Sequence, residues 1–265
     1  MNSAPQGNCV QPPAGGRLAV VSGGGTGIGR ASAAALLVAG CHLLLLGRRR
    51  QLLESAVAAL GAEAGDRWVG SRVVDVSEPS DVAELASHLR ATGRRVDVLV
   101  NNAGSPAAST QGDKGLAALS SSWLETYRAN VVSAVLLTSG LEPLLTRPGG
   151  RVVLLGSTAG LTGGASPAYV AAKAALHGWV LSLAGRLGPD GITVNVVAPG
   201  YTEDTELVAG RIPPDRRERL VAGIAAGRPG RAVDIAAAVS FLASPGAAFV
   251  NGQVLAVHGS LVPVS

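Results

Sequence analysis

The feature that most constrains the fold of this sequence is a regular alternation of short apolar runs with longer helical patterns. The apolar runs are rich in Val, Ile and Leu throughout, as expected of strands that are covered on both faces. They lie at 18–22, 42–47, 72–76, 96–100, 151–156, 192–197 and 254–257. Helical patterns lie between them at 27–39, 49–60, 79–91, 121–141, 168–187 and 231–243. Because such alternation builds right-handed βαβ units, the sequence predicts a doubly wound α/β fold of about seven parallel strands, with helices on both faces.

The length of 265 residues suits one domain of this kind. Residues 1–16 are rich in Pro, Gly, Asn and Gln, so we expect a flexible N-terminal tail there and a single catalytic domain at 17–265. Two connections, 105–122 and 198–230, are long for a compact domain. The second leaves the carboxyl end of a strand, where open parallel sheets bind their ligands. We therefore expect a substrate lid at about 201–226.

Composition argues against several other classes of protein. Apolar residues make up 47% of the chain and charged residues 15%, which excludes a disordered chain. Aromatic residues make up only 3%, so there are few stacking platforms for single-stranded nucleic acid. A net charge of +4 without a basic module is weak support for nucleic-acid binding, and we expect no nucleic-acid partner.

The apolar stretch 31–47 has the hydropathy of a membrane span but is slightly too short, and Gly40 and His42 interrupt it. We interpret it as a buried helix followed by a buried strand. Cys9 and Cys41 form no CxxC pair, which fits a reducing cytoplasm. The histidines show no ligand spacing. We therefore expect a cytoplasmic protein with no membrane segment and no metal site.

A glycine-rich turn follows the first apolar run. Gly23, Gly27 and Gly29 have the spacing GxxxGxG between a predicted strand and a predicted helix, which is the place of a dinucleotide-binding turn. Glycines there let the backbone approach a pyrophosphate, and the helix N-terminus supplies amide donors. Glycine-rich turns without a ligand are common in such a chain, but the position after the first strand favours a cofactor. The residues expected to contact it are Gly23, Gly25, Thr26, Gly27, Ile28 and Gly29.

The end of the second predicted strand indicates which dinucleotide binds. A carboxylate there would bind the ribose 2′-hydroxyl of NAD, whereas this chain has Gly47 followed by Arg48. A guanidinium suits the 2′-phosphate of NADP(H) through charge-assisted hydrogen bonds, so we predict NADP(H). The alternative is that the arginines at 48–50 simply begin a solvated helix. The residues expected around the 2′-phosphate and the adenine are Arg48, Arg49, Asp75 and Val76.

Asparagines follow the fourth predicted strand, in Asn101-Asn102-Ala103-Gly104. Asparagine tolerates left-handed backbone geometry, and its amide can tie loop backbone together. This segment could be an ordinary turn, but it is predicted at the same sheet edge as the glycine turn. We therefore expect Asn102, Ala103 and Gly104 to contact the cofactor.

Tyr169 and Lys173 are four residues apart in a helical stretch, so they lie on one face. An ammonium near the phenol favours tyrosinate and is expected to lower the pKa of Tyr169, which could then protonate a forming alkoxide. Ser157, at the end of the fifth predicted strand, could hold the substrate carbonyl oxygen. A YxxxK pair also occurs in ordinary helices. A hydrolase with Ser157 as nucleophile is the rival interpretation, but no GxSxG elbow surrounds that residue.

Together these motifs resemble the short-chain dehydrogenase/reductase family. The motifs that carry the resemblance are Gly23/Gly27/Gly29, Asn101-Ala103-Gly104, Ser157, Tyr169-xxx-Lys173 and Pro199-Gly200, over residues 17 to about 262. The resemblance implies a Rossmann fold and hydride transfer between a nicotinamide and a carbonyl carbon. It also implies a homo-oligomer, either a tetramer or a dimer. The C-terminal part is similar to that of bacterial 3-oxoacyl-thioester reductases.

The resemblance further implies roles for single residues. The family's catalytic tetrad maps to Asn130, Ser157, Tyr169 and Lys173, with Asn130 supporting a water-linked proton relay to the lysine. Tyr169 and Lys173 are also expected to contact the cofactor, and Lys173 is expected to bond to the nicotinamide ribose. The residues implied to flank the nicotinamide and the phosphates are Pro199, Gly200 and Thr202.

Departures from the family pattern leave the substrate open. Ser22 stands where a threonine is usual, and the stretch 104–130 is a few residues longer than usual. Because the extra length falls near the expected substrate mouth, we expect an NADPH-dependent ketoreductase for a polyketide or another natural-product ketone, free or carrier-bound. One alternative is a 3-oxoacyl-thioester reductase of the fatty-acid type. The other is an NADP-binding regulator without catalytic activity.

Overall fold

A single parallel sheet organises the part of the chain that the computed structural model describes, residues 15–106, 115–205 and 212–260. Its seven strands lie in the order β3-β2-β1-β4-β5-β6-β7. Their bounds are β1 (Leu18–Ser22), β2 (His42–Gly47), β3 (Val69–Val73), β4 (Val98–Asn101), β5 (Arg151–Leu155), β6 (Thr193–Pro199) and β7 (Val254–Val257). The strand order reverses where β1 lies beside β4, so their carboxyl ends border the crevice in which such sheets bind ligands. The predicted doubly wound α/β fold is confirmed.

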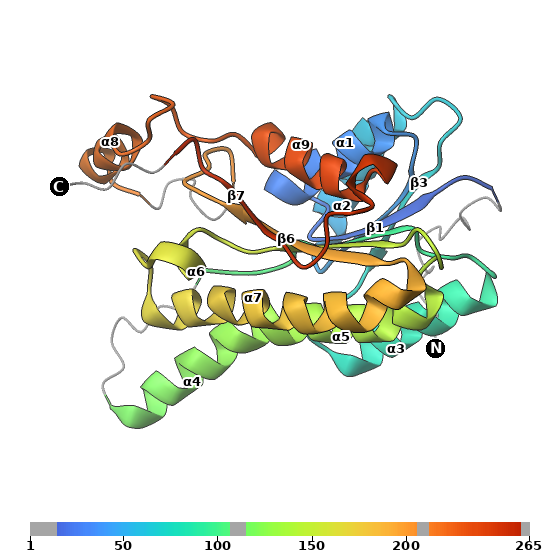
Figure 1. The fold of residues 1–265 in the computed structure, drawn as a ribbon, viewed down its shortest axis with the longest axis horizontal. Helices are drawn as coiled ribbons and strands as arrows, with labels where there is room; N and C mark the ends of the chain where they lie inside the picture. Colours follow the sequence, from blue (N-terminus) through green and yellow to red (C-terminus); the bar gives the residue numbers. More distant parts are fainter. Residues whose placement is uncertain (1–14, 107–114, 206–211, 261–265) are drawn as a thin grey trace, which may run out of the picture.

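Helices cover both faces of the sheet (Figure 1). On one face lie α1 (Gly27–Val38), α2 (Arg50–Gly61) and α9 (Ala232–Ala243). On the other lie α3 (Pro79–Ala91), α5 (Ser133–Leu141) and α7 (Pro167–Leu187), with α4 (Leu116–Tyr127) leading into α5 through a π-helical turn at Arg128–Val132. The short α6 (Ala159–Thr162) and α8 (Pro214–Ala222) lie toward one end of the sheet.

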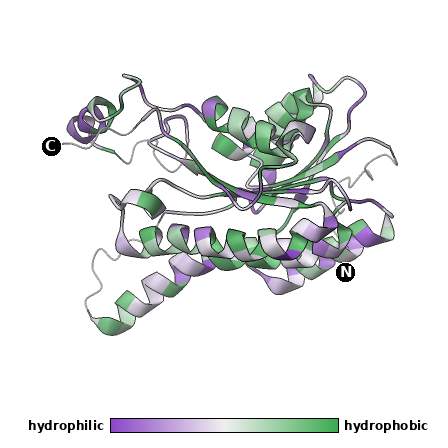
Figure 2. Ribbon diagram, viewed as in Figure 1, coloured by the Kyte–Doolittle hydropathy of each residue, from purple (hydrophilic) through white to green (hydrophobic). Residues whose placement is uncertain are grey.

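The hydrophobic core is divided in two by the sheet. Along β2, Leu43 and Leu45 pack with α1 and α9, whereas Leu44 and Leu46 pack with α3, α5 and α7. All four leucines are buried, which is why this strand is apolar at successive positions instead of alternating. Figure 2 shows hydrophobic residues in the helices of both layers. The core therefore holds the carboxyl ends of the strands in fixed relative positions.

Two predicted elements have different bounds in the structure. The third strand, predicted at 72–76, is β3 at Val69–Val73, because it pairs with β2 from Leu43↔Val69 to Gly47↔Val73. Asp75 and Val76 therefore lie in the loop after the strand and not at its end. The helix predicted at 121–141 begins at Leu116 instead, since serine is only a mildly poor helix former and the serines at 120–122 do not stop it. The other predicted bounds agree within two residues.

Two short helices add to the predicted connections. The expected lid at 201–226 contains α8, and α6 follows Ser157. Residues 206–211 of that lid, and residues 1–14 of the expected tail, lie outside the described residues.

None of the helices in the described ranges is both long and apolar enough to cross a membrane. The stretch 31–47 forms the end of α1 and the whole of β2, as interpreted from the sequence. Among the described side chains, no group of three His, Cys, Asp or Glu residues is arranged to hold a metal ion.

Candidate active site

The glycine turn after β1 packs tightly against the first turn of α1. A Cβ atom on Gly29 would lie 2.1 Å from the carbonyl oxygen of Gly23 and 2.5 Å from Nδ2 of Asn102. No side chain fits there, so glycine is required for this close approach. The first turn of α1 leaves backbone N–H groups without helical partners, and these can bind an anion such as a phosphate.

The hydroxyl of Ser22 joins the glycine turn to the asparagine turn after β4. Its Oγ accepts the backbone N–H groups of Asn102 and Ala103, each at 3.0 Å, and donates to the carbonyl oxygen of Val100 at 3.3 Å. Nδ2 of Asn102 donates to the carbonyl oxygens of Ser22 and Gly23, at 3.0 and 3.2 Å. The expected role of Asn102 in tying loop backbone is therefore observed, and Ser22 supplies a second tie.

These two turns form one wall of a cavity of about 610 Å³. This volume suits a small-molecule or cofactor site. The predicted cofactor residues that line it are Gly23, Gly25, Thr26, Arg48, Arg49, Asp75, Val76, Ala103 and Gly104. Gly27, Ile28, Gly29 and Asn102 lie next to that lining in the same turns. The structure thus brings together residues from the ends of β1, β2 and β4 and from the loop after β3.

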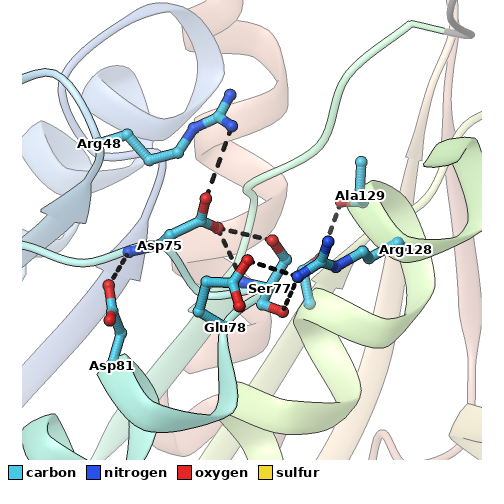
Figure 3. Close-up of polar contacts among 8 residues, drawn as sticks. Arg48, Asp75, Ser77, Glu78, Asp81, Arg128 and Ala129 are labelled. Atoms are coloured by element: carbon cyan, nitrogen blue, oxygen red, sulfur yellow. Dashed lines mark hydrogen bonds and ion pairs between the residues drawn. The ribbon is translucent and has the colours of Figure 1, made fainter.

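Opposite charges meet on the wall of this cavity, as the side chains in Figure 3 show. The Arg48 guanidinium is largely exposed and lies 3.6 Å from the Asp75 carboxylate. Asp75 also accepts the backbone N–H of Ser77 at 3.0 Å and its hydroxyl at 2.7 Å. Burial alone would raise the pKa of Asp75, but the Ser77 hydrogen bonds and the charges of Arg48 and Arg128 outweigh it and lower that pKa. Asp75 is therefore a carboxylate at neutral pH.

The tetrad residues from the segment after β5, from α7 and from the π-helical turn also come together. Lys173 is buried on α7, and its Nζ lies 5.6 Å from the centre of the Tyr169 ring. The same Nζ donates to the carbonyl oxygen of Leu155 at 2.9 Å. Ser157, two residues beyond Leu155, forms a side-chain hydrogen bond with Tyr169. The phenol thus lies between a hydroxyl and an ammonium.

Asn130 completes the group from the π-helical turn between α4 and α5. Its Nδ2 donates to the carbonyl oxygens of Ser105 and Thr126, at 2.9 and 3.0 Å. Its Oδ1 is buried without a hydrogen-bond partner. A Cβ on Gly104 would lie 2.7 Å from this oxygen and 3.5 Å from Nζ of Lys173. Glycine at 104 therefore leaves room between the two groups, and the unpartnered oxygen can accept a hydrogen bond from a water.

Burial dominates the electrostatics of this group. It lowers the pKa of Lys173 to about 8. It also raises the pKa of Tyr169, and the hydrogen bond with Ser157 only partly opposes that rise. The lowered pKa expected for Tyr169 is therefore wrong, because the desolvation of the phenol outweighs the Ser157 hydrogen bond, and Lys173 is not among the causes of the shift. Tyr169 is protonated at neutral pH, as a proton donor must be.

The loop after β6 lies between these two parts of the site. Pro199 accepts hydrogen bonds from the backbone N–H and the hydroxyl of Thr158, at 2.9 and 3.2 Å. The N–H of Gly200 donates to Val257 at 2.9 Å, and the hydroxyl of Thr202 donates to Gly200 at 3.0 Å. Thr205, three residues further, packs near Gly27. These residues do not line the 610 Å³ cavity, but they adjoin both the glycine turn and the segment after β5.

Sequence reasoning missed several lining residues, above all Glu78 and Arg128. Glu78 precedes α3, and Arg128 begins the π-helical turn that contains Asn130. The two side chains form an ion pair on the cavity wall. The only available signal was the position of Arg128, two residues before Asn130. π-helical turns often occur at functional sites, but a π-helical turn cannot be recognised from sequence periodicity.

Comparison with known proteins agrees with this geometry. The family model described as enoyl-(acyl carrier protein) reductase matches residues 23–260. The chain is 34% identical to 3-oxoacyl-[acyl-carrier-protein] reductase FabG of Escherichia coli over 255 residues, which are 94% of this chain and 98% of that protein.

Two solved structures are also similar. One is a putative NAD(P)-dependent gluconate 5-dehydrogenase from Beutenbergia cavernae with bound NADP, at 35% identity and a TM-score of 0.81, covering 93% of this chain and 96% of that one. The other is a blue fluorescent protein from a metagenomic library in complex with NADPH, at 30% identity and a TM-score of 0.80, covering 92% and 96%. The family model spans nearly all of the sheet and both parts of the site. The chain therefore belongs to the short-chain dehydrogenase/reductase family and is an oxidoreductase of alcohol and carbonyl groups.

Proposed function

We propose that the protein is an NADP(H)-dependent ketoreductase. The observation that supports this most is the adjacency of two sites: a buried Lys173 beside a protonated Tyr169, and a cavity whose glycine wall leaves room for a ligand. The close fit of Gly29 on Gly23 and the free N–H groups of α1 suit a pyrophosphate. Arg48, exposed after β2, suits a 2′-phosphate. The cofactor is NADP(H), which the two similar solved structures contain in their own sites.

When bound, NADPH supplies the hydride that reduces a carbonyl carbon. Tyr169 donates its phenolic proton to the carbonyl oxygen as negative charge develops there. Ser157 donates a hydrogen bond to the same oxygen and so orients the substrate. The ammonium of Lys173 stabilises the phenolate that Tyr169 becomes. The unpartnered Oδ1 of Asn130 holds a water through which the proton is replaced.

The substrate that we propose is the ketone group of a polyketide or another natural product, free or carrier-bound, with a 3-oxoacyl thioester as the alternative. FabG of Escherichia coli, 34% identical to this chain, is named for a 3-oxoacyl group on a carrier protein. We propose that the lid at 201–226, of which the structure describes 201–205 and 212–226, borders the substrate. Within it, Glu203 accepts hydrogen bonds from Tyr201 at 3.2 Å and from Nη2 of Arg217 at 3.1 Å, which ties α8 to the loop after β6.

The test is consumption of NADPH and NADH by the purified protein on a panel of ketones. The panel contains β-ketothioesters, polyketide-like aromatic ketones and quinones, and sugar-acid ketones. We expect turnover with NADPH that exceeds turnover with NADH by at least about tenfold, the discrimination that one lost charge-assisted phosphate contact gives.

The variant Arg48→Ala tests the cofactor assignment within the same panel. It should raise KM for NADPH and reduce the preference for NADPH over NADH, while KM for NADH changes little. Tight NADPH binding without turnover of any ketone would instead support the non-catalytic regulator. Equal use of both cofactors by the unaltered protein would contradict the NADP(H) proposal.

The protein is also proposed to form a homo-oligomer. Leu116, Leu119 and Trp123 are exposed and recur at helical spacing, so they form one apolar stripe on α4. Figure 2 shows hydrophobic residues at the projecting end of this helix. Exposed apolar stripes of this kind on a folded protein are typical of interaction sites.

Replacing Leu119 and Trp123 together by Glu should therefore convert an oligomer into a smaller species. Multi-angle light scattering over a concentration series measures this change. The matched control is Leu181→Glu, at an apolar position on α7 that is more exposed than Leu119 and Trp123. An unaltered protein that is monomeric at all concentrations, or a double variant of unchanged mass, would contradict the α4 interface.

A further inference from the structure

Four charged side chains lie together on the wall of the cavity, and we refer to Arg48, Asp75, Glu78 and Arg128 as the charged rim. Figure 3 shows them converging from the end of β2, the loop after β3, the start of α3 and the π-helical turn. Arg48 pairs with Asp75 at 3.6 Å, and Arg128 pairs with Glu78. Arg128 also donates to the carbonyl oxygen of Ser77 at 3.5 Å. The rim is thus two ion pairs side by side.

The charges on the cavity wall balance one another. The lining includes the guanidinium groups of Arg48, Arg49 and Arg128 and the carboxylates of Asp75, Glu78 and Glu125. A 2′-phosphate carries up to two negative charges, so any uncompensated carboxylate near Arg48 opposes its binding. Asp75 and Glu78 are the carboxylates of the rim. The charge balance of the rim therefore depends on both Arg48 and Arg128.

We propose that Arg128 is a specificity-determining residue for NADP(H), because it neutralises Glu78 and leaves Arg48 available to the 2′-phosphate. This inference rests on the proposed cofactor. Arg48 is already attracted to Asp75. An unpaired Glu78 beside that pair would be a second carboxylate that competes with the 2′-phosphate for Arg48. Arg128 removes this competitor through its direct ion pair.

The influence of Arg128 also reaches Asp75. Its charge is among the causes that lower the pKa of that carboxyl, after the Ser77 hydrogen bonds and Arg48. Both side chains of the Glu78–Arg128 pair are about half exposed, so the pair adds little to folding stability. Its effect should instead appear in the binding of a highly charged ligand and should weaken as salt is added.

Calorimetric titration with two adenosine probes tests this role without turnover. Adenosine 2′,5′-bisphosphate carries the 2′-phosphate, whereas adenosine 5′-monophosphate does not. Arg128→Gln should weaken binding of the bisphosphate by about 3- to 10-fold at low salt and of the monophosphate by less than about twofold, as expected for one unscreened unit charge near a phosphate. The double variant Glu78→Gln/Arg128→Gln should recover the affinity of the unaltered protein.

The control is Arg186→Gln, which breaks an exposed pair with Glu142 away from the cavity and should leave both affinities unchanged. Equal weakening of both probes would overturn the inference, since it would mean that Arg128 maintains the shape of the cavity. A double variant as weak as Arg128→Gln, or an unaffected Arg128→Gln, would overturn it as well. If the unaltered protein bound both probes equally, the proposed NADP(H) preference itself would fail, and this inference with it.

Discussion

Tyr169→Phe is expected to lower kcat by about 10²- to 10⁴-fold, the usual contribution of a positioned proton donor. The substitution removes only the hydroxyl, and the ring remains above Nζ of Lys173. Without this hydroxyl the forming alkoxide loses its proton donor, and the Lys173 ammonium, which lies 5.6 Å from the centre of the ring and donates to Leu155, is not placed to replace it. NADPH affinity should change by less than about threefold, because the substitution keeps the aromatic ring and leaves every residue that lines the 610 Å³ cavity unchanged.

Single-turnover kinetics and NADPH fluorescence titration separate these two effects. Tyr127→Phe is the matched control, since it removes an exposed tyrosine hydroxyl from α4 and should lower kcat by less than about twofold. A Tyr169→Phe variant that kept more than a tenth of the original kcat would contradict the role of the phenol. Loss of NADPH binding in parallel with kcat would show that Tyr169 maintains the site and does not act on the substrate.

The parts of this site that are local in sequence could be predicted, because their spacing alone determines their geometry. The i, i+4 spacing puts Tyr169 and Lys173 on one face of α7, and the apolar run before Gly23 places the glycine turn at a strand end. The end of β2 was also predictable, since the leucines at 43–46 run without interruption up to Gly47.

Contacts between distant residues could not be predicted in this way. Ser22 and the N–H of Asn102 are 80 residues apart, and Glu78 and Arg128 are 50 residues apart, so no local pattern joins them. The direction in which the pKa of Tyr169 shifts was predicted wrongly for the same reason. The spacing to Lys173 is visible in the sequence, whereas the burial that raises the pKa of Tyr169 comes from the packing of other elements.

The largest structural effect is expected for Gly29→Ala. The added methyl group would lie 2.1 Å from the carbonyl oxygen of Gly23, a backbone atom that cannot rotate away as a side chain could. The glycine turn must then move and lose the hydrogen bonds from Nδ2 of Asn102 at 3.0 and 3.2 Å. We expect a loss of about 2–4 kcal/mol in the free energy of unfolding, typical of overpacking combined with lost buried hydrogen bonds.

Gly185→Ala is a control with the same chemical change in a helix, at a position on α7 where a Cβ would have no atom within 4 Å. It should gain about 0.5–1 kcal/mol, since alanine is the better helix former. Urea unfolding measures both free energies of unfolding. NADPH titration of the folded Gly29→Ala protein should show binding weakened by more than about 100-fold, because a displaced turn no longer presents its N–H groups to the pyrophosphate. A Gly29→Ala protein as stable and as tightly binding as the original would mean that the turn has another conformation when the cofactor binds.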